Sequence, residues 1–198
     1  MSSDSAGAAF ELEPYNTREK YGLTGTVGGF GQVDVFYVRP VNHRPGDLLR
    51  SEVVGEHLPE TYVTGIGMGE PYMSRKATLS VGGVIGKLAY NVLGLRRESR
   101  ALHVSLADRT YTYASTGDKQ AVELRRAEAR VTFRDGAHVR RAGYRRIGTV
   151  TGPVDATDLA VALVFERVDV AWLSVGGVLR TAPFRMLTSQ KDGDGGPA

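Results

Sequence analysis

The distribution of apolar residues divides the chain into two parts. Most of it shows short runs in which apolar and polar residues alternate, separated by glycines and turn residues, as is typical of antiparallel strands. Residues 155–173 hold its one long apolar block. A helix that is apolar on every side has to be buried on every side. We therefore predict an α+β fold that is mainly antiparallel β, with a barrel-like sheet wrapped around a hydrophobic C-terminal helix at about 155–173.

The ends of this block favour a helix. Asp155 is suited to the N-cap position, and Asp158 three residues later completes a carboxylate version of the capping box. Gly176 and Gly177 supply a C-terminal stop. The β-branched valines of the segment leave a buried strand as the alternative. The two aspartates could also form a carboxylate pair for acid–base chemistry, but capping explains them more simply.

Several strands follow from the alternation. Residues 21–39 predict a strand, a glycine turn and a second strand, and residues 77–81 predict another. The clearest hairpin has a two-residue turn at Asp108-Arg109, which places Leu106 opposite Tyr111. Residues 122–134 predict one strand, with Ala127, Ala129, Val131 and Phe133 on one face and polar residues on the other. Asp135-Gly136 is typical of a tight turn, but the two-residue register does not fit the apolar pattern, so a longer loop and a bulge both stay open.

Other segments are less regular. Residues 40–69 predict loops with short strands, and residues 82–95 fit either a short helix or a strand broken by glycine. Residues 1–9 and 188–198 are small and polar, so we expect disordered tails around a single β-rich domain over 10–187. A length of 198 residues suits one domain.

The composition excludes several kinds of site. The chain has no Cys, which excludes disulfides, thiolate nucleophiles and Cys-ligated metal centres. The N-terminus lacks the basic and apolar regions of a signal peptide, and the longest unbroken apolar run, residues 159–165, is too short to span a membrane. We expect a cytoplasmic location without a transmembrane segment, and a peripheral position at the membrane if the protein binds lipid.

Positive charge is concentrated in one stretch. The net charge is +3, yet residues 124–146 hold eight arginines against Glu128 and Asp135. Clustered guanidinium groups attract phosphates on lipids, nucleic acids or small metabolites. A solvated, arginine-rich hairpin face is the structural alternative. The candidate anion-binding residues are Arg125, Arg126, Arg130, Arg140, Arg141, Arg145 and Arg146.

Other candidate chemistry is weaker. The glycine patterns at 25–31 and 65–69 lack the following helix that a phosphate-binding loop needs, so we interpret them as turns. The acids around His57 could supply metal ligands, but Pro59 interrupts any helix that would align them. We predict no metal site and no cofactor. No catalytic motif of high specificity is present, so we assign no catalytic residue and favour a protein that is not an enzyme.

Three functions compete. The first is a non-enzymatic binding module for a small anionic ligand or for phospholipid headgroups, through the arginine-rich strands. Nucleic acid is disfavoured because aromatic platforms and a groove-reading helix are missing beside the arginines. The second is a β-barrel that binds a small molecule, or a cofactor-free enzyme, with its site in residues 40–69. The third is a protein-interaction module that uses an exposed sheet edge. The ligand, the oligomeric state and whether the barrel interior is open stay undetermined.

The order of these elements resembles the tubby C-terminal-like superfamily, which includes plant LURP-one-related proteins and phospholipid scramblases. The resemblance rests on residues 111–114, the arginine-rich strands within 122–146 and the apolar segment 158–165, and it covers roughly 76–187. It implies a closed antiparallel barrel around a central hydrophobic helix, and binding of phosphoinositides or membranes. Many bacterial members have no assigned role. The cysteine-rich stretch of scramblases has no counterpart, so the resemblance does not imply lipid flipping.

Overall fold

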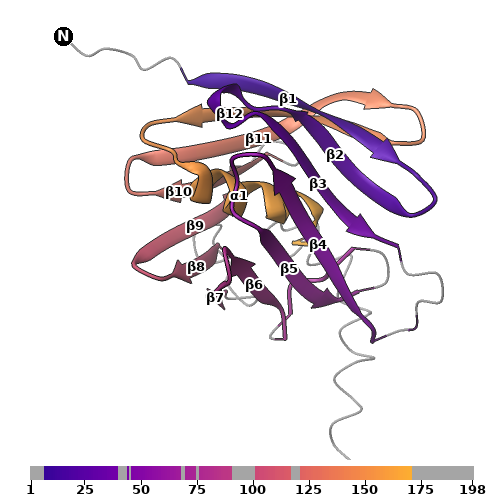
Figure 1. Ribbon diagram of the computed structural model, residues 1–198, viewed down its shortest axis with the longest axis horizontal. Helices are drawn as coiled ribbons and strands as arrows, with labels where there is room; N and C mark the ends of the chain where they lie inside the picture. The colour runs from indigo at the N-terminus through magenta and orange to yellow at the C-terminus, as the bar shows by residue number, and fades with distance from the viewer. Residues whose placement is uncertain are drawn as a thin grey trace, which may run out of the picture.

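The computed structural model describes residues 7–39, 44, 46–67, 70–74, 76–90, 101–116 and 121–170. In these ranges twelve strands form one closed antiparallel barrel (Figure 1). Each strand pairs with its neighbours in the sequence, and β1 closes the circle by pairing with β12. The strands are β1 (Ala8–Asn16), β2 (Lys20–Thr26), β3 (Gln32–Val38), β4 (Leu48–Gly55), β5 (Thr61–Ile66), β6 (Thr78–Val81), β7 (Val84–Ala89), β8 (Leu102–Leu106), β9 (Arg109–Ser115), β10 (Val122–Arg126), β11 (Ala129–Val139) and β12 (Gly143–Thr151).

The helix α1 (Ala156–Val164) lies inside this barrel, and a 3-10 turn, η3 (Phe165–Arg167), continues it (Figure 1). The segment 159–164 has no exposed surface. The predicted fold, a mainly antiparallel barrel around an apolar C-terminal helix, is confirmed.

The helix is shorter than predicted. It ends at Val164 rather than at 173, because Val168 adopts an extended backbone and Asp169 forms a parallel bridge with Tyr72. The β-branched residues that favoured a strand therefore decide the structure after the 3-10 turn. Residues 171–173 and the predicted stop at Gly176 and Gly177 lie outside the described residues.

The start of α1 is capped as predicted. Asp155 has an extended backbone, and its Oδ1 accepts a hydrogen bond from the Asp158 N–H at 3.0 Å. Asp158 Oδ2 accepts one in return from the Asp155 N–H at 3.2 Å. This reciprocal pair satisfies two of the backbone donors that a helix start leaves free.

Inward-facing side chains from all around the barrel pack against α1. The strands alternate buried and exposed positions, as a sheet with one face on the core should. Aromatic rings supply much of the filling: Tyr113 lies 5.1 Å from Phe165 of η3, and Phe133 meets Phe10 edge-on at 5.8 Å, measured between ring centroids. All four rings are at most 8% exposed, so the core fills the space between helix and sheet.

The hairpin of β8 and β9 differs from the prediction in its register. The predicted turn lay at Asp108-Arg109, whereas Leu106 pairs with Arg109 and Tyr111 pairs with Val104. The turn therefore begins one residue earlier. Because the register changes by two residues, each side chain keeps the face that the pattern predicted.

Residues 122–134 form two strands rather than one. β10 and β11 meet at a turn over Ala127-Glu128, where Ala127 has a φ of 46°. The apolar alternation changes phase at Arg125-Arg126, from even-numbered positions in β10 to odd-numbered positions in β11, and this change marks the turn. Of the positions predicted on the apolar face, 129, 131 and 133 are buried, whereas Ala127 lies in the turn and is exposed.

The tight turn predicted at Asp135-Gly136 is wrong. β11 runs on to Val139, and its register with β12 shifts between Asp135 and His138. This irregularity is the bulge that the pattern had left open. The chain turns at 140–142 instead, where Arg141 has a φ of 67°.

Regular strands occupy the two segments for which the sequence predicted loops with short strands, or either a helix or a strand. Residues 40–69 contain β4 and β5, and within 82–95 a turn at Gly82-Gly83 leads into β7. The strand interpretation of residues 84–89 was thus the correct one of the two. β1 begins at Ala8, inside the predicted N-terminal tail, while residues 1–6 and 171–198 lie outside the described part of the chain.

Candidate functional site: the basic rim

The seven arginines predicted to bind anions do not form one surface. Strand alternation sends some of them into the barrel and others to its outer face, and two lie in a turn. An arginine that already holds a buried carboxylate is a poor anion receptor, because its donors are used. The contacts of each therefore decide which remain candidates.

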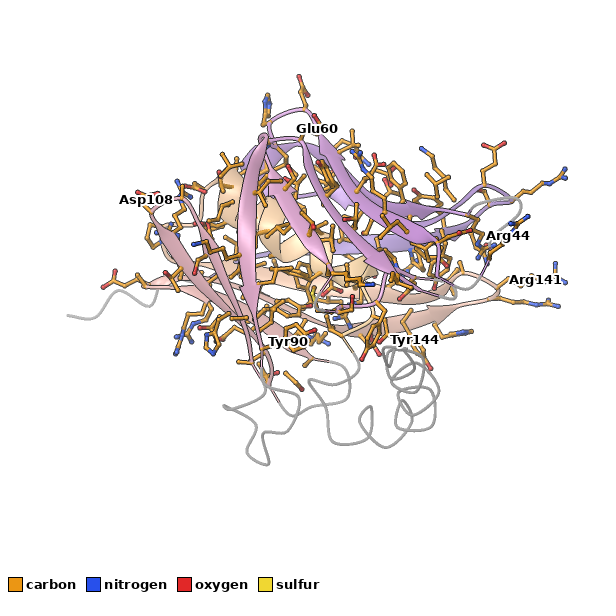
Figure 2. All side chains as sticks on the ribbon, turned by 90° about the horizontal axis from the view of Figure 1, so that it is seen from below. Arg44, Glu60, Tyr90, Asp108, Arg141 and Tyr144 are labelled. Atoms are coloured by element: carbon orange, nitrogen blue, oxygen red, sulfur yellow. The ribbon has the colours of Figure 1, made fainter. Side chains whose placement is uncertain are left out.

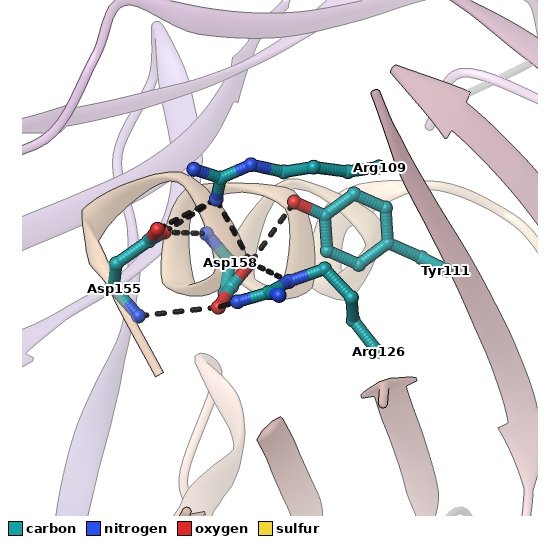
Figure 3. A network of polar contacts seen from close by, with 5 residues as sticks. All are labelled: Arg109, Tyr111, Arg126, Asp155 and Asp158. Atoms are coloured by element: carbon teal, nitrogen blue, oxygen red, sulfur yellow. Dashed lines mark hydrogen bonds and ion pairs between the residues drawn. The ribbon is translucent and has the colours of Figure 1, made fainter. Parts of the chain in front are cut away.

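Arg126 belongs to a structural network at the start of α1 (Figure 3). Its Nε and Nη2 donate to the two carboxylate oxygens of Asp158 at 2.8 and 2.7 Å. Arg109 bridges both aspartates, with Nη1 2.6 Å from Asp155 Oδ2 and 3.2 Å from Asp158 Oδ1, and the Tyr111 hydroxyl donates to Asp158 at 2.9 Å. Asp158 is 2% exposed. These arginines tie the helix to the barrel wall.

Electrostatics of this network favour the ionised carboxylate. Burial alone would raise the pKa of Asp158, but hydrogen bonds from Arg126, from the Asp155 backbone and from Tyr111 outweigh it, and the pKa is lowered. Burial raises the pKa of Tyr111 to about 12, so its hydroxyl stays a donor. The two aspartates considered as an acid–base pair are thus held as a cap and an ion-pair centre.

Arg146 is also an internal residue. It is 8% exposed and pairs with Asp135 of β11 and with Glu166 of η3. Tyr113 donates to the same Glu166 at 3.2 Å, and burial raises the pKa of that tyrosine well above its usual value. This cluster fixes the end of the helix inside the barrel.

On the outer face, three predicted residues have mixed surroundings. Arg145 pairs with Glu13 at 2.7 Å and with Glu11 at 3.3 Å. Arg130 lies 3.6 Å from Glu123. Arg125 is exposed and stands directly opposite Arg130 across the β10–β11 pair, so two like charges face each other.

Arg140 and Arg141 form the turn between β11 and β12, and both are exposed. The turn is held to the neighbouring connection, because Asn16 Nδ2 donates to the Arg141 carbonyl at 2.8 Å. No ion pair joins either guanidinium to an acid within the described residues.

Three further arginines lie at the same end of the barrel. Arg18 is in the β1–β2 connection, Arg39 follows β3 and Arg44 precedes β4. Arg39 N donates to the Glu19 carbonyl at 2.7 Å, which joins two of these connections. Arg44 and Arg141 lie at one edge of the molecule, far from Asp108 (Figure 2). We call this set the basic rim: Arg18, Arg39, Arg44, Arg140 and Arg141.

The sequence reasoning missed Arg18, Arg39 and Arg44 because they are isolated along the chain. Their common signal is topological: in an up-and-down barrel, the first, third and eleventh connections all lie at one end. Each of the three follows or precedes a strand in one of these connections. Counting strands correctly, rather than counting local charge, would have found them.

The other candidates have ordinary structural surroundings. Glu52 and Glu60 both pair with Arg50, so these two acids are held as ion-pair partners of an arginine. In the described ranges, no group of three or more His, Asp or Glu side chains is placed to hold a metal ion. The first glycine pattern forms the turn η1 (Gly28–Phe30), and Gly65 lies inside β5.

Comparisons with protein-family models, with curated proteins and with solved structures found no match for this chain. The resemblance to the tubby C-terminal-like superfamily therefore stays a prediction. The assignment of function rests on the geometry alone.

Proposed function

We propose that the protein is a non-enzymatic module that binds anionic ligands, phospholipid headgroups among them, through the basic rim. The observation that supports this is the convergence of five arginines from three separate connections on one end of the barrel. The described residues of those connections include only two acids, Glu19 and Asp47. A guanidinium group matches phosphate geometry, with two parallel N–H donors for two oxygens.

Exposed apolar side chains beside the rim support a lipid surface as one source of the anion. Val38 at the end of β3 is 45% exposed, Leu48 at the start of β4 is 66% exposed, and Tyr144 after the hairpin turn is 48% exposed. Cations combined with apolar and aromatic side chains suit the interface of an anionic bilayer. No helix in the described part of the chain is long and apolar enough to cross a membrane.

The two alternative functions have less support. The interior is occupied by α1 and by buried apolar and aromatic side chains, so a small-molecule site within the barrel has little room among the described residues. A closed barrel has no free edge strand, and an interaction module of the edge-pairing kind would need one.

Vesicle flotation tests the proposal. The full chain is mixed with neutral phosphatidylcholine vesicles and with vesicles that also contain phosphatidylserine, at low and high salt. We expect binding to the anionic vesicles alone, weaker at high salt. The variant Arg140→Glu/Arg141→Glu should lose at least about 30-fold in affinity, since each cation near an anionic surface is worth about 1 kcal/mol.

The matched control is Arg125→Glu/Arg134→Glu, which changes the net charge equally but alters exposed residues on the side of the barrel. A rim-specific site leaves this control close to the wild type. Equal losses in both variants would mean that only net charge matters, and the rim would not be the site.

A further inference from the structure

A buried arginine lies directly beneath the basic rim. Arg167 of η3 has a side chain that is 10% exposed, and its Cζ lies 4.6 Å from the ring centroid of Tyr21. Arg39, a member of the rim, places its Cζ 5.7 Å from the same centroid. Tyr21 in turn tilts against Tyr37 at 5.6 Å between ring centroids. One aromatic ring therefore joins a surface guanidinium to a buried one.

The hairpin of the rim also packs on this ring. A Cβ placed on Gly143 would lie 2.7 Å from Tyr21 Oη, so only glycine allows this close approach. Gly143 has a φ of 103°, which also favours glycine. The turn that carries Arg140 and Arg141 is thereby held next to Tyr21.

Arg167 is the least satisfied of the buried arginines described. Its Nη1 lies 3.6 Å from Glu70 Oε1, beyond hydrogen-bond distance, and its Nε is buried without a hydrogen-bond partner. Arg146, the other buried arginine of the described residues, by contrast pairs with both Asp135 and Glu166. A buried charged group with an unused donor is costly, so an acceptor that reaches it is favoured.

Glu70 is poorly placed to be that acceptor. Burial raises the pKa of its carboxyl group, Asp169 and Glu166 add to this rise, and only Arg167 opposes it. The side chain is nevertheless 32% exposed, so part of it is in contact with solvent. Among the described residues its one ion pair is the long contact with Arg167, which a stronger acceptor can replace.

We propose that a phosphate or phosphomonoester group displaces the Glu70 carboxylate and binds Arg167 and Arg39 at the ring of Tyr21. This inference rests on the proposed function of the rim and adds an inner subsite to it. A phosphate carries more acceptor oxygens and more charge than a carboxylate, so it can accept hydrogen bonds from Arg167 Nη1 and from Arg39 at the same time. Without ligand, Glu70 compensates the charge of Arg167 and acts as an internal competitor.

The test compares Glu70→Gln with wild type for three probes, using the full chain. Two probes are soluble, inorganic phosphate and glycerol phosphate, measured by calorimetry; the third is a phosphatidylcholine vesicle containing phosphatidic acid. Because a partly exposed ion pair changes an equilibrium constant by roughly a factor of five, Glu70→Gln should bind about fivefold more tightly. Arg167→Lys should bind more weakly than wild type. The control is Glu52→Gln, which loses its pair with Arg50 on the outer face and should bind as wild type does.

The outcomes separate the two proposals. Tighter binding of soluble probes by Glu70→Gln supports the subsite with a free phosphate compound as ligand, and tighter binding of the vesicles alone supports it with a lipid headgroup. Unchanged affinity of Glu70→Gln for every probe overturns the displacement, even if Arg140→Glu/Arg141→Glu still abolishes binding and the rim proposal stands. If circular dichroism shows that Arg167→Lys does not fold, the affinity of Glu70→Gln for the three probes is the test of the proposal.

Discussion

Asp158 is the carboxylate that joins α1 to the barrel wall, and its removal tests the structure most directly. The change Asp158→Asn keeps the shape of the side chain but removes its charge. It leaves Arg126 and Arg109 without the buried partner that both share. It also weakens the capping box, because the amide cannot accept every hydrogen bond that the carboxylate accepts.

The expected loss of stability follows from the burial of Asp158 and its partners. Removing one partner of a buried ion pair costs about 3–5 kcal/mol. The arginine side chains are 26% and 31% exposed, so water compensates them in part, while Asp158 is 2% exposed. We therefore expect a loss of about 3 kcal/mol, at the lower end of that range. Asp155→Asn is the control: Asn caps a helix as well as Asp, and an exposed ion pair is worth at most about 1 kcal/mol.

Equilibrium unfolding in urea measures both changes. With a slope of about 2 kcal/mol per molar urea, Asp158→Asn should lower the midpoint by ~1.5 M and Asp155→Asn by less than ~0.5 M. The folded pKa of Asp158 is lowered, so its contribution is present above the unfolded pKa of about 4 and is lost as the pH falls below it. The gap between wild type and Asp158→Asn should therefore narrow at pH 3. A loss equal to that of Asp155→Asn, or a gap that does not change with pH, would refute the reasoning.

Two further predictions concern backbone geometry. Ala127 has a φ of 46° in the β10–β11 turn, so Ala127→Gly should stabilise the protein by roughly 0.5–1 kcal/mol. Ala129→Gly in the adjoining strand should destabilise it by a similar amount. Urea unfolding should therefore give changes of opposite sign for the two variants. Gly148 faces the ring of Phe10, which a Cβ would overlap. Gly148→Ala should therefore cost about 1–3 kcal/mol, and Phe10→Leu in the same chain should recover part of the loss; no recovery would contradict the steric cause.

The apolar alternation predicts which face of the sheet a residue occupies better than it predicts which residue lies opposite on the neighbouring strand. For the β8–β9 hairpin, the predicted register is wrong by two residues, yet Leu106 and Tyr111 still face the core. The reason is physical: burial selects between the two faces of a strand, while the turn selects the register. The β10–β11 turn contains Ala127, although alanine is not a residue that favours turns. Asp135-Gly136 is a sequence that favours a tight turn, but it forms part of a bulge in β11 instead. Tertiary pairing overrides both local signals.

The alternation also indicates which arginines point into the barrel, and the count of local charges did not take this into account. Arg126 lies two residues after the buried Leu124, and Arg146 lies two residues before the buried Gly148. Residues two apart share a face of a strand, so both arginines point into the barrel. Their inward position predicts a buried carboxylate partner for each, as Asp158 and Glu166 provide. The partners lie far away in the sequence, and only the closed barrel brings them together.

The two ends of α1 differ in how completely their charges are satisfied, and this difference directs the search for function. At its start, Asp158 accepts hydrogen bonds from two arginines, a tyrosine and the backbone, which leaves little for a ligand to gain. Beyond its end, Arg167 has one long ion pair among the described residues and an unused Nε donor, and it stacks on Tyr21 beside Arg39 of the rim. A ligand gains affinity where it completes interactions that the free protein leaves unmade, and not where it must replace good ones. Arg167 therefore offers a ligand more interactions to complete than the capped start of α1 does.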